Sequence, residues 1–154
     1  MADKNNQNDV DDQFRAILEG LRTTLPGVQV LFAFLLVLPL QASFGDIATV
    51  EKFAYYVAFF GSAMASVLLI APSAHQRVRA PISGIERRSG RHLRFTVAIT
   101  IVGTVIFAIA LAAAVFLVSS LTLSLGVAVV ATVAVSLVMA WSWFYVPLVS
   151  FQRS

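Results

Sequence analysis

The basic segment His75–Arg94 constrains the fold most, because it is the longest polar interruption in an otherwise apolar chain. Two apolar stretches precede it and two follow it. About 20 consecutive apolar residues cross a bilayer as a helix, and short loops rich in Lys and Arg stay on the cytoplasmic side. The sequence therefore predicts an all-α fold, a bundle of four transmembrane helices in which this segment is the inner loop.

Composition supports the bilayer as the solvent of this chain. Hydrophobic residues make up 58% of it and charged residues only 12%, whereas roughly a quarter of the residues of a soluble protein are charged. The net charge of +3 comes from basic residues that lie beside the apolar stretches. Positive-inside topology and anionic lipid head groups account for this charge, so we expect a lipid partner and no nucleic acid. The absence of cysteine excludes disulfides, thiolate metal sites and cysteine nucleophiles.

The N-terminal 24 residues are expected to lie outside the bilayer. Residues 1–9 are polar, which predicts a disordered tail. In residues 10–24 apolar side chains recur at helical spacing and charged ones fall on the opposite face, which predicts an amphipathic helix on the inner membrane surface. We expect Leu25-Pro26-Gly27 to end this helix, with Pro26 in the first turn of the next one. The N-terminus lacks the basic region and apolar core of a signal peptide, so the first span should remain in the mature protein.

Residues 25–151 form the predicted membrane domain. Its spans are expected at about 28–44, 53–71, 93–118 and 125–149, with the basic cytoplasmic loop at 73–92. Pro39 should kink the first span or open its hydrogen bonds. Lys52 is the one basic residue of the predicted outer loop, which places both termini in the cytoplasm.

Polar residues recur at helical spacing within the spans and are the candidate site residues. They are Thr96, Thr100, Thr104, Thr132, Ser136, Ser62 and Ser66. No ionisable side chain lies deep in the spans, which argues against a carrier that uses a buried carboxylate and leaves open a channel lined by hydroxyls. Hydroxyl stripes more often pack helices together, so the pore-lining and packing interpretations both stay open.

A second candidate is an ionic latch at the inner surface, formed if the amphipathic helix folds under the bundle. Its members would be Glu19, Arg22, Gln29, His75 and Arg77. Because a histidine changes charge near neutral pH, the latch could respond to acidification, although an interfacial histidine beside lipid head groups is the simpler interpretation. The sequence contains no zinc-ligand spacing, no nucleophile with a base and no phosphate-binding loop, so we predict no metal, no cofactor and no enzymatic activity.

Part of the sequence resembles a known family. Glu19, Leu21-Arg22 and the run Leu25-Pro26-Gly27-Val28-Gln29-Val30-Leu31-Phe32-Ala33-Phe34-Leu35-Leu36, with Ala71-Pro72-Ser73-Ala74-His75 and Arg77, are similar to a family of small bacterial integral-membrane proteins of unknown function, common in actinobacteria. The resemblance is best in the first half of the chain. It implies a bacterial cytoplasmic (inner) membrane location. Some members carry an automatic sodium:proton antiporter label, so it also implies transport as an expectation. The resemblance further implies that the 25–29 and 72–77 segments form one inner-surface feature.

Two functions remain open. Four short spans enclose little volume, so we expect a homo-oligomer. The first function is an ion channel or small transporter, which the hydroxyl stripes favour. The second is a non-enzymatic structural or regulatory membrane subunit that acts on lipid or on an unidentified membrane partner through its amphipathic helix and basic loop.

Overall fold

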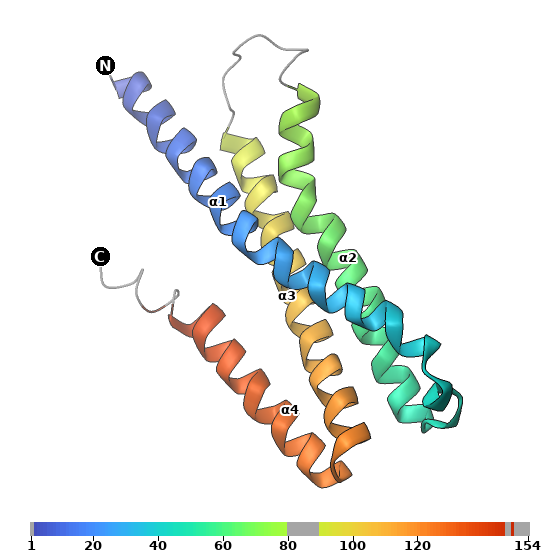
Figure 1. The fold of residues 1–154 in the computed structure, drawn as a ribbon. Helices are drawn as coiled ribbons and strands as arrows, with labels where there is room; N and C mark the ends of the chain where they lie inside the picture. The colour runs from blue at the N-terminus through green and yellow to red at the C-terminus, as the bar shows by residue number, and fades with distance from the viewer. Residues whose placement is uncertain (1, 80–89, 147–148, 150–154) are drawn as a thin grey trace. The chain divides into compact units, whose positions relative to one another are not determined.

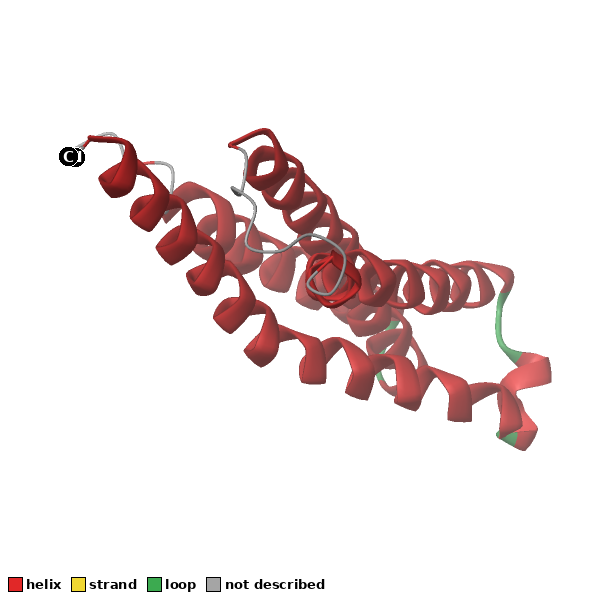
Figure 2. Ribbon diagram, turned by 90° about the horizontal axis from the view of Figure 1, so that it is seen from above, coloured by secondary structure: helices red, strands yellow, loops and turns green. Residues whose placement is uncertain are grey.

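The computed structural model describes residues 2–79, 90–146 and 149, and in these residues the chain is helical, without a strand (Figures 1 and 2). The α-helices are α1 Ala2–Val37, α2 Thr49–Arg79, α3 Gly90–Thr122 and α4 Leu125–Ala140. Two 3₁₀-helices, Leu38–Leu40 and Ala42–Asp46, connect α1 to α2, and a π-helix, Trp141–Tyr145, follows α4.

Four helical stretches are long and apolar enough to cross a membrane. They contain 26, 27, 29 and 19 residues and are Arg15–Leu40, Thr49–His75, Arg94–Thr122 and Leu125–Trp143. The predicted all-α bundle with four membrane spans is therefore confirmed. The central part of the predicted basic loop, residues 80–89, lies outside the described residues, and helices α2 and α3 extend into its two ends.

Helix α1 continues through the residues where the sequence predicted a tail and then a break. Residues 2–9 lie within α1, and the helix passes Pro26 without ending. The predicted boundary at Leu25–Gly27, between a separate surface helix and the first span, is therefore wrong. Proline removes the N–H that would bond the carbonyl of Arg22 and crowds that carbonyl, but membrane helices tolerate this where hydroxyls and packing stabilise the turn.

Both kinds of support surround Pro26. The hydroxyls of Thr23 and Thr24 donate to the carbonyl of Gly20 at 2.8 and 3.0 Å, one turn before the proline. Leu21 and Val28, seven residues apart on either side of Pro26, are both buried. A break at Pro26 would separate these two residues, so their common burial favours a continuous helix.

Most buried residues of α1, α2 and α3 follow a seven-residue repeat, in which the spacing alternates between three and four. The repeat comprises Leu21, Val28 and Leu35 in α1; Tyr55, Ala58, Ser62, Ala65, Leu69 and Pro72 in α2; and Thr96, Gly103, Phe107, Ala110, Ala114 and Leu117 in α3, while Ala54 of α2 is buried outside it. Such a repeat keeps one seam of each helix against its neighbours, as in left-handed coiled coils. On α2 the repeat passes from Ser62 to Ala65, so the candidate residue Ser66 is only half-buried.

The chain forms two compact units, and α1, α2 and α3 each contribute to both. The first unit comprises Met1–Ala33 and Ser62–Ile106. Gly103 of α3 lies close to α2 in this unit, because a Cβ added at Gly103 would lie 3.0 Å from Leu69 Cδ2 and 3.2 Å from Leu68 Cβ. Only glycine permits this approach without a shift of the helices.

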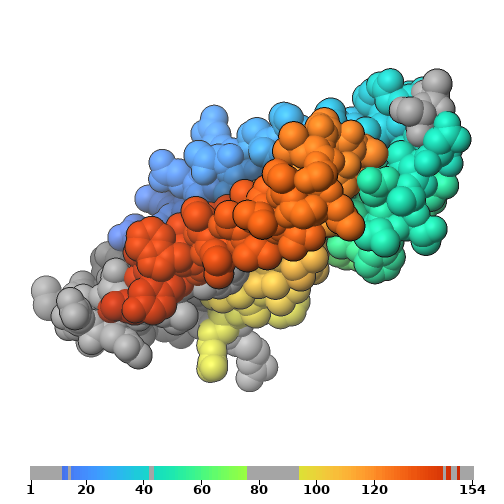
Figure 3. All heavy atoms as spheres, turned by 90° about the horizontal axis from the view of Figure 1, so that it is seen from below, coloured from blue at the N-terminus to red at the C-terminus, as the bar shows by residue number. Residues whose placement is uncertain are grey.

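The second unit comprises Phe34–Gly61 and Phe107–Ser154, and it contains α4. A tight turn joins α3 to α4, with the amide of Leu123 donating to the carbonyl of Ser119 at 2.8 Å. Near the far end of α4 the ring of Trp143 stacks on Phe107 of α3, with centroids 6.1 Å apart. Much of α4 lies at the surface in Figure 3, and within the helix only Ala128 and Met139 are buried.

The start of α2 is fixed by two polar contacts. Glu51, in the first turn, accepts a hydrogen bond from the amide of Ala48 at 2.8 Å. This is the bond by which the acid of a capping box satisfies a free amide at a helix start. Lys52 Nζ donates to the carbonyl of Gly45 at 2.9 Å and holds the preceding 3₁₀-helix against α2. The α-helix before this connection ends at Val37, two residues before Pro39, where we expected disrupted hydrogen bonding.

Candidate functional site

The hydroxyl stripe of α3 lies in or beside the buried seam of the first unit. Thr96 is 3% exposed, and Thr100 and Thr104 are half-buried. Thr100 donates to the carbonyl of Thr96 and Thr104 to that of Thr100, both at 2.9 Å. These hydroxyls therefore satisfy their donors within their own helix and present only acceptor lone pairs to a neighbour.

Two hydroxyls, one on α2 and one on α4, follow the same pattern. Ser66 donates to the carbonyl of Ser62 at 2.9 Å, and Thr132 donates to that of Ala128 at 2.8 Å. Ser62 is fully buried, and Ser136 is half-buried on α4. Of the seven candidates, two are buried and five are half-buried, and whether they line a pore or only pack helices stays a prediction.

The described side chains of the predicted inner latch are not bonded to one another. Glu19, Arg22 and Gln29 of α1 are exposed, as is His75 near the end of α2. Among these four described side chains there is no ion pair or hydrogen bond from one to another. The side chain of Arg77 lies outside the described part of the chain. The latch therefore stays a prediction.

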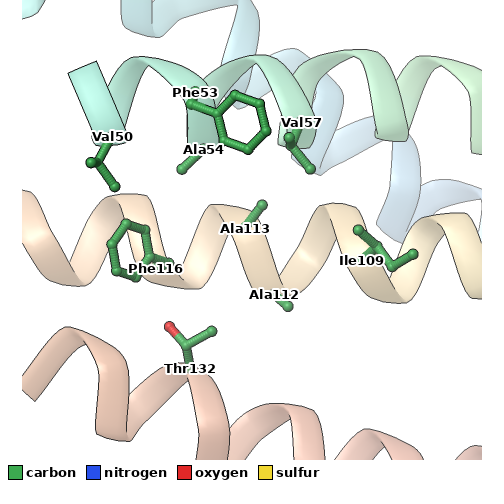
Figure 4. Close-up of a pocket in the computed structure, with 9 residues that line it drawn as sticks. All are labelled: Val50, Phe53, Ala54, Val57, Ile109, Ala112, Ala113, Phe116 and Thr132. Atoms are coloured by element: carbon green, nitrogen blue, oxygen red, sulfur yellow. The ribbon is translucent and has the colours of Figure 1, made fainter. Parts of the chain in front are cut away.

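The second unit contains an open groove that the sequence did not indicate. Its volume is about 320 Å³, and its lining residues come from the first turns of α2, from α3 and from α4 (Figure 4). They are Val50, Phe53, Ala54, Val57, Ile109, Ala112, Ala113, Phe116 and Thr132. Thr132 contributes the one polar side-chain group of this lining, and its hydroxyl already donates within α4. The groove suits an apolar ligand.

Small residues make the groove, and they were the signal that could have revealed it. Ala54 on α2 and Ala112 and Ala113 on α3 lie in its middle, while larger side chains, Val50 and Phe116 at one end and Ile109 at the other, close the ends (Figure 4). The apolar pattern of the sequence does not distinguish a small residue such as Ala from a large one such as Phe, so it does not indicate a groove. Only the pairing of α2 with α3 shows that the alanines of the two helices meet.

Aromatic side chains gather on another face of α2 in the same unit. Phe44 meets the buried ring of Tyr55 edge to face, with centroids 4.9 Å apart, and Phe59 stacks on Tyr55 at 5.8 Å. Tyr56 contacts Tyr55 at 5.4 Å. Edge-to-face and offset aromatic pairs stabilise their elements, so this cluster fastens the connection after α1 to α2.

In the described residues no three His, Asp or Glu side chains come together as metal ligands would. The side chains that do converge, at the groove and in the seams, are apolar groups and hydroxyls, and those of Thr100, Thr104 and Thr132 donate within their own helices. Such an arrangement can bind apolar chains or helices. That the protein needs no cofactor stays a prediction.

Comparison with known proteins identifies a family. Neither the curated proteins nor the solved structures provided a match. Residues 3–147, nearly the whole chain, match a family described as a family of unknown function. This match includes all four spans and the groove. The chain therefore belongs to the DUF6328 family.

Proposed function

We propose that this membrane protein is a non-enzymatic structural or regulatory subunit of a bacterial cytoplasmic membrane. One observation carries the proposal: the hydroxyls of Ser66, Thr100, Thr104 and Thr132 each donate to a carbonyl of their own helix. Hydroxyls arranged in this way let helices pack closely and leave no donor aimed into a polar pathway.

The first part of α1 supplies the contact region of the proposed subunit. Its charged side chains Arg15, Glu19 and Arg22 are exposed, while Leu21 of the same turn is buried. An amphipathic segment of this kind can lie on the inner leaflet or receive another protein. In this proposal both termini are cytoplasmic, and several copies of the chain assemble, because α4 exposes most of its apolar surface.

A homo-oligomeric channel or small transporter is the second candidate. It is favoured by Thr100 and Thr104, whose half-buried oxygens retain lone pairs that can coordinate a cation. A pathway lined by these oxygens would have to form between copies, because the cavity described within one copy is apolar.

Ion flux in sealed liposomes separates the two candidates. Sodium, potassium, protons and chloride are tested in turn against empty vesicles, with folding checked by circular dichroism. The subunit proposal expects flux equal to that of the empty vesicles. Selective flux that Thr100→Val abolishes would overturn it, provided that Thr122→Val, an exposed threonine with the same intrahelical bond, retains the flux.

Assembly gives an independent test of the proposed subunit. We expect the complex extracted from native membranes to have the mass of several chains, and deletion of residues 1–22 to remove its membrane partners. A strictly monomeric species that retains all its partners after the deletion would contradict both expectations.

A further inference from the structure

The groove of the second unit lies at a defined depth in the predicted membrane. It begins at Val50, in the first turn of α2, and extends to Val57, two turns further along the helix. At a rise of 1.5 Å per residue, this is a length of about 10 Å along α2. Because α2 begins beside the polar connection that contains Asp46, the groove occupies the part of one leaflet nearest the head groups.

The groove is also aligned with the direction of lipid chains. In Figure 4, Val50 and Phe116 stand at one end and Val57 and Ile109 at the other, so the groove follows the antiparallel helices α2 and α3. Acyl chains likewise extend along the membrane normal. Its walls are continuous with the surface that meets lipid, since Val50, Phe53 and Ile109 are themselves 61%, 70% and 55% exposed.

The size of the groove selects among apolar occupants. A helix with its side chains is about 10–12 Å across, and the two turns that the groove spans would need well above the 320 Å³ that it offers. A water molecule in the liquid takes up about 30 Å³. The groove therefore has room for on the order of ten small groups, each about as large as a water molecule. A single hydrocarbon chain matches this volume, whereas a helix from a second copy could insert only its side chains.

We propose that this groove binds one acyl chain of a phospholipid. Side chains of α2, α3 and α4 surround the chain on three sides, whereas a convex helix surface touches a lipid from one side only. Lipid tails are as apolar as the groove, so no hydrophobic driving force acts between them. The favourable free energy of binding comes from dispersion contacts and from filling a void. This inference goes beyond the proposed function, which needs no lipid site.

Photolabelling tests the site in the full-length protein. The protein is reconstituted in phosphatidylcholine vesicles with a small fraction of phosphatidylcholine that carries a diazirine on one acyl chain, and labelled residues are located by mass spectrometry. We expect label on groove residues, such as Val57 and Ile109, several-fold above that on exposed residues elsewhere on the spans, such as Val130 and Leu137. If the label were instead spread uniformly over all exposed residues of the wild-type protein, the proposal would be overturned.

A second experiment uses variants whose larger side chains fill the groove. Ala113→Phe, and the milder Ala112→Leu, should reduce groove labelling several-fold and release phospholipid that otherwise stays bound in native mass spectra. Ala98→Leu is the matched control, because Ala98 is an exposed alanine of α3 outside the groove, and it should change neither readout. Unchanged labelling in both filled variants, or cross-links from groove residues to a second copy, would refute an acyl-chain site. Unchanged labelling would not bear on the subunit proposal, which rests on flux and assembly, and cross-links to a second copy would support its assembly while refuting the acyl-chain site.

Discussion

At the scale of single residues, the distance between α2 and α3 in the first unit depends on the missing side chain of Gly103. Any Cβ there meets Leu68 Cβ at 3.2 Å, an atom fixed to the backbone of α2. A flexible side chain could turn away, but Leu68 Cβ can move only with its helix. Close packing in protein interiors makes such an overlap costly.

Gly103→Ala should therefore destabilise the protein by about 1–3 kcal/mol, the usual cost of overpacking. The measurement is unfolding in detergent followed by circular dichroism. Gly126→Ala is the matched control, since it adds the same methyl group to a helix where nothing lies within 4 Å. That variant should be neutral or stabilise by up to about 1 kcal/mol, from helix propensity. Equal stability of the two variants would show that α2 and α3 are not in close contact at Gly103.

Glu51 governs the start of α2 through its bond to the amide of Ala48. Glu51→Ala should cost about 1 kcal/mol, as loss of a helix cap does. Hydrogen exchange should be faster for the amides of residues 48–52 and unchanged in the middle of α2. Glu51→Gln retains an oxygen that can accept the bond and should restore most of the protection. If the glutamine variant exchanges as fast as the alanine variant, the charge of Glu51 matters and the cap does not.

At the scale of elements, Pro26 makes one turn of α1 weaker than the rest. Pro26→Ala returns the N–H that the carbonyl of Arg22 lacks and should strengthen the helix there by up to about 3 kcal/mol. Amide exchange in residues 24–30 should then slow by up to roughly two orders of magnitude. Gly27→Ala, whose added methyl group meets nothing within 4 Å, is the control and should slow exchange by at most about fivefold. Equal effects of the two changes would mean that Pro26 does not weaken this turn.

Elements were predictable from the sequence where a single physical property decides them. The four spans follow from apolar length, which the bilayer enforces. The end of α1 near Pro39 follows from proline chemistry. The continuity of α1 through Pro26 was not predictable, because it depends on Leu21 and Val28 being buried on one line by other helices. Local proline chemistry favoured a break, and tertiary packing outweighed it.

The candidate site shows the same division. Spacing alone revealed that Thr96, Thr100 and Thr104 share one helix face, but not that Thr96 is buried or that the hydroxyls donate within α3. The groove could not be predicted without knowing which helices lie next to each other. The apolar pattern does not indicate the π-helix after α4. Trp143 of this π-helix stacks on Phe107 of α3, which is 36 residues away in the sequence, so this contact could not be predicted either.

At the scale of the whole molecule, charge asymmetry sets the orientation that we propose. Of the 11 Lys and Arg residues, Lys52 alone lies near the connection between the first two spans, at the start of the second span. Translocation of basic loops is disfavoured, so the connection at residues 38–48 should face outward and the α2–α3 connection inward. The orientation in turn assigns the groove at the start of α2 to the outer leaflet.

Because the chain contains no cysteine, single cysteines report this orientation without a background. Asp46→Cys, in the exposed connection before α2, should react with a membrane-impermeant maleimide on intact spheroplasts. His75→Cys, exposed at the other end of the same span, should react only after the membrane is opened. Val105→Cys, in the middle of α3, is the control and should stay unlabelled until the protein is denatured, because an aqueous thiolate does not form in hydrocarbon. The reverse labelling of Asp46→Cys and His75→Cys would place the basic segment outside, and would move both the groove and the exposed charges of α1 to the opposite faces of the membrane.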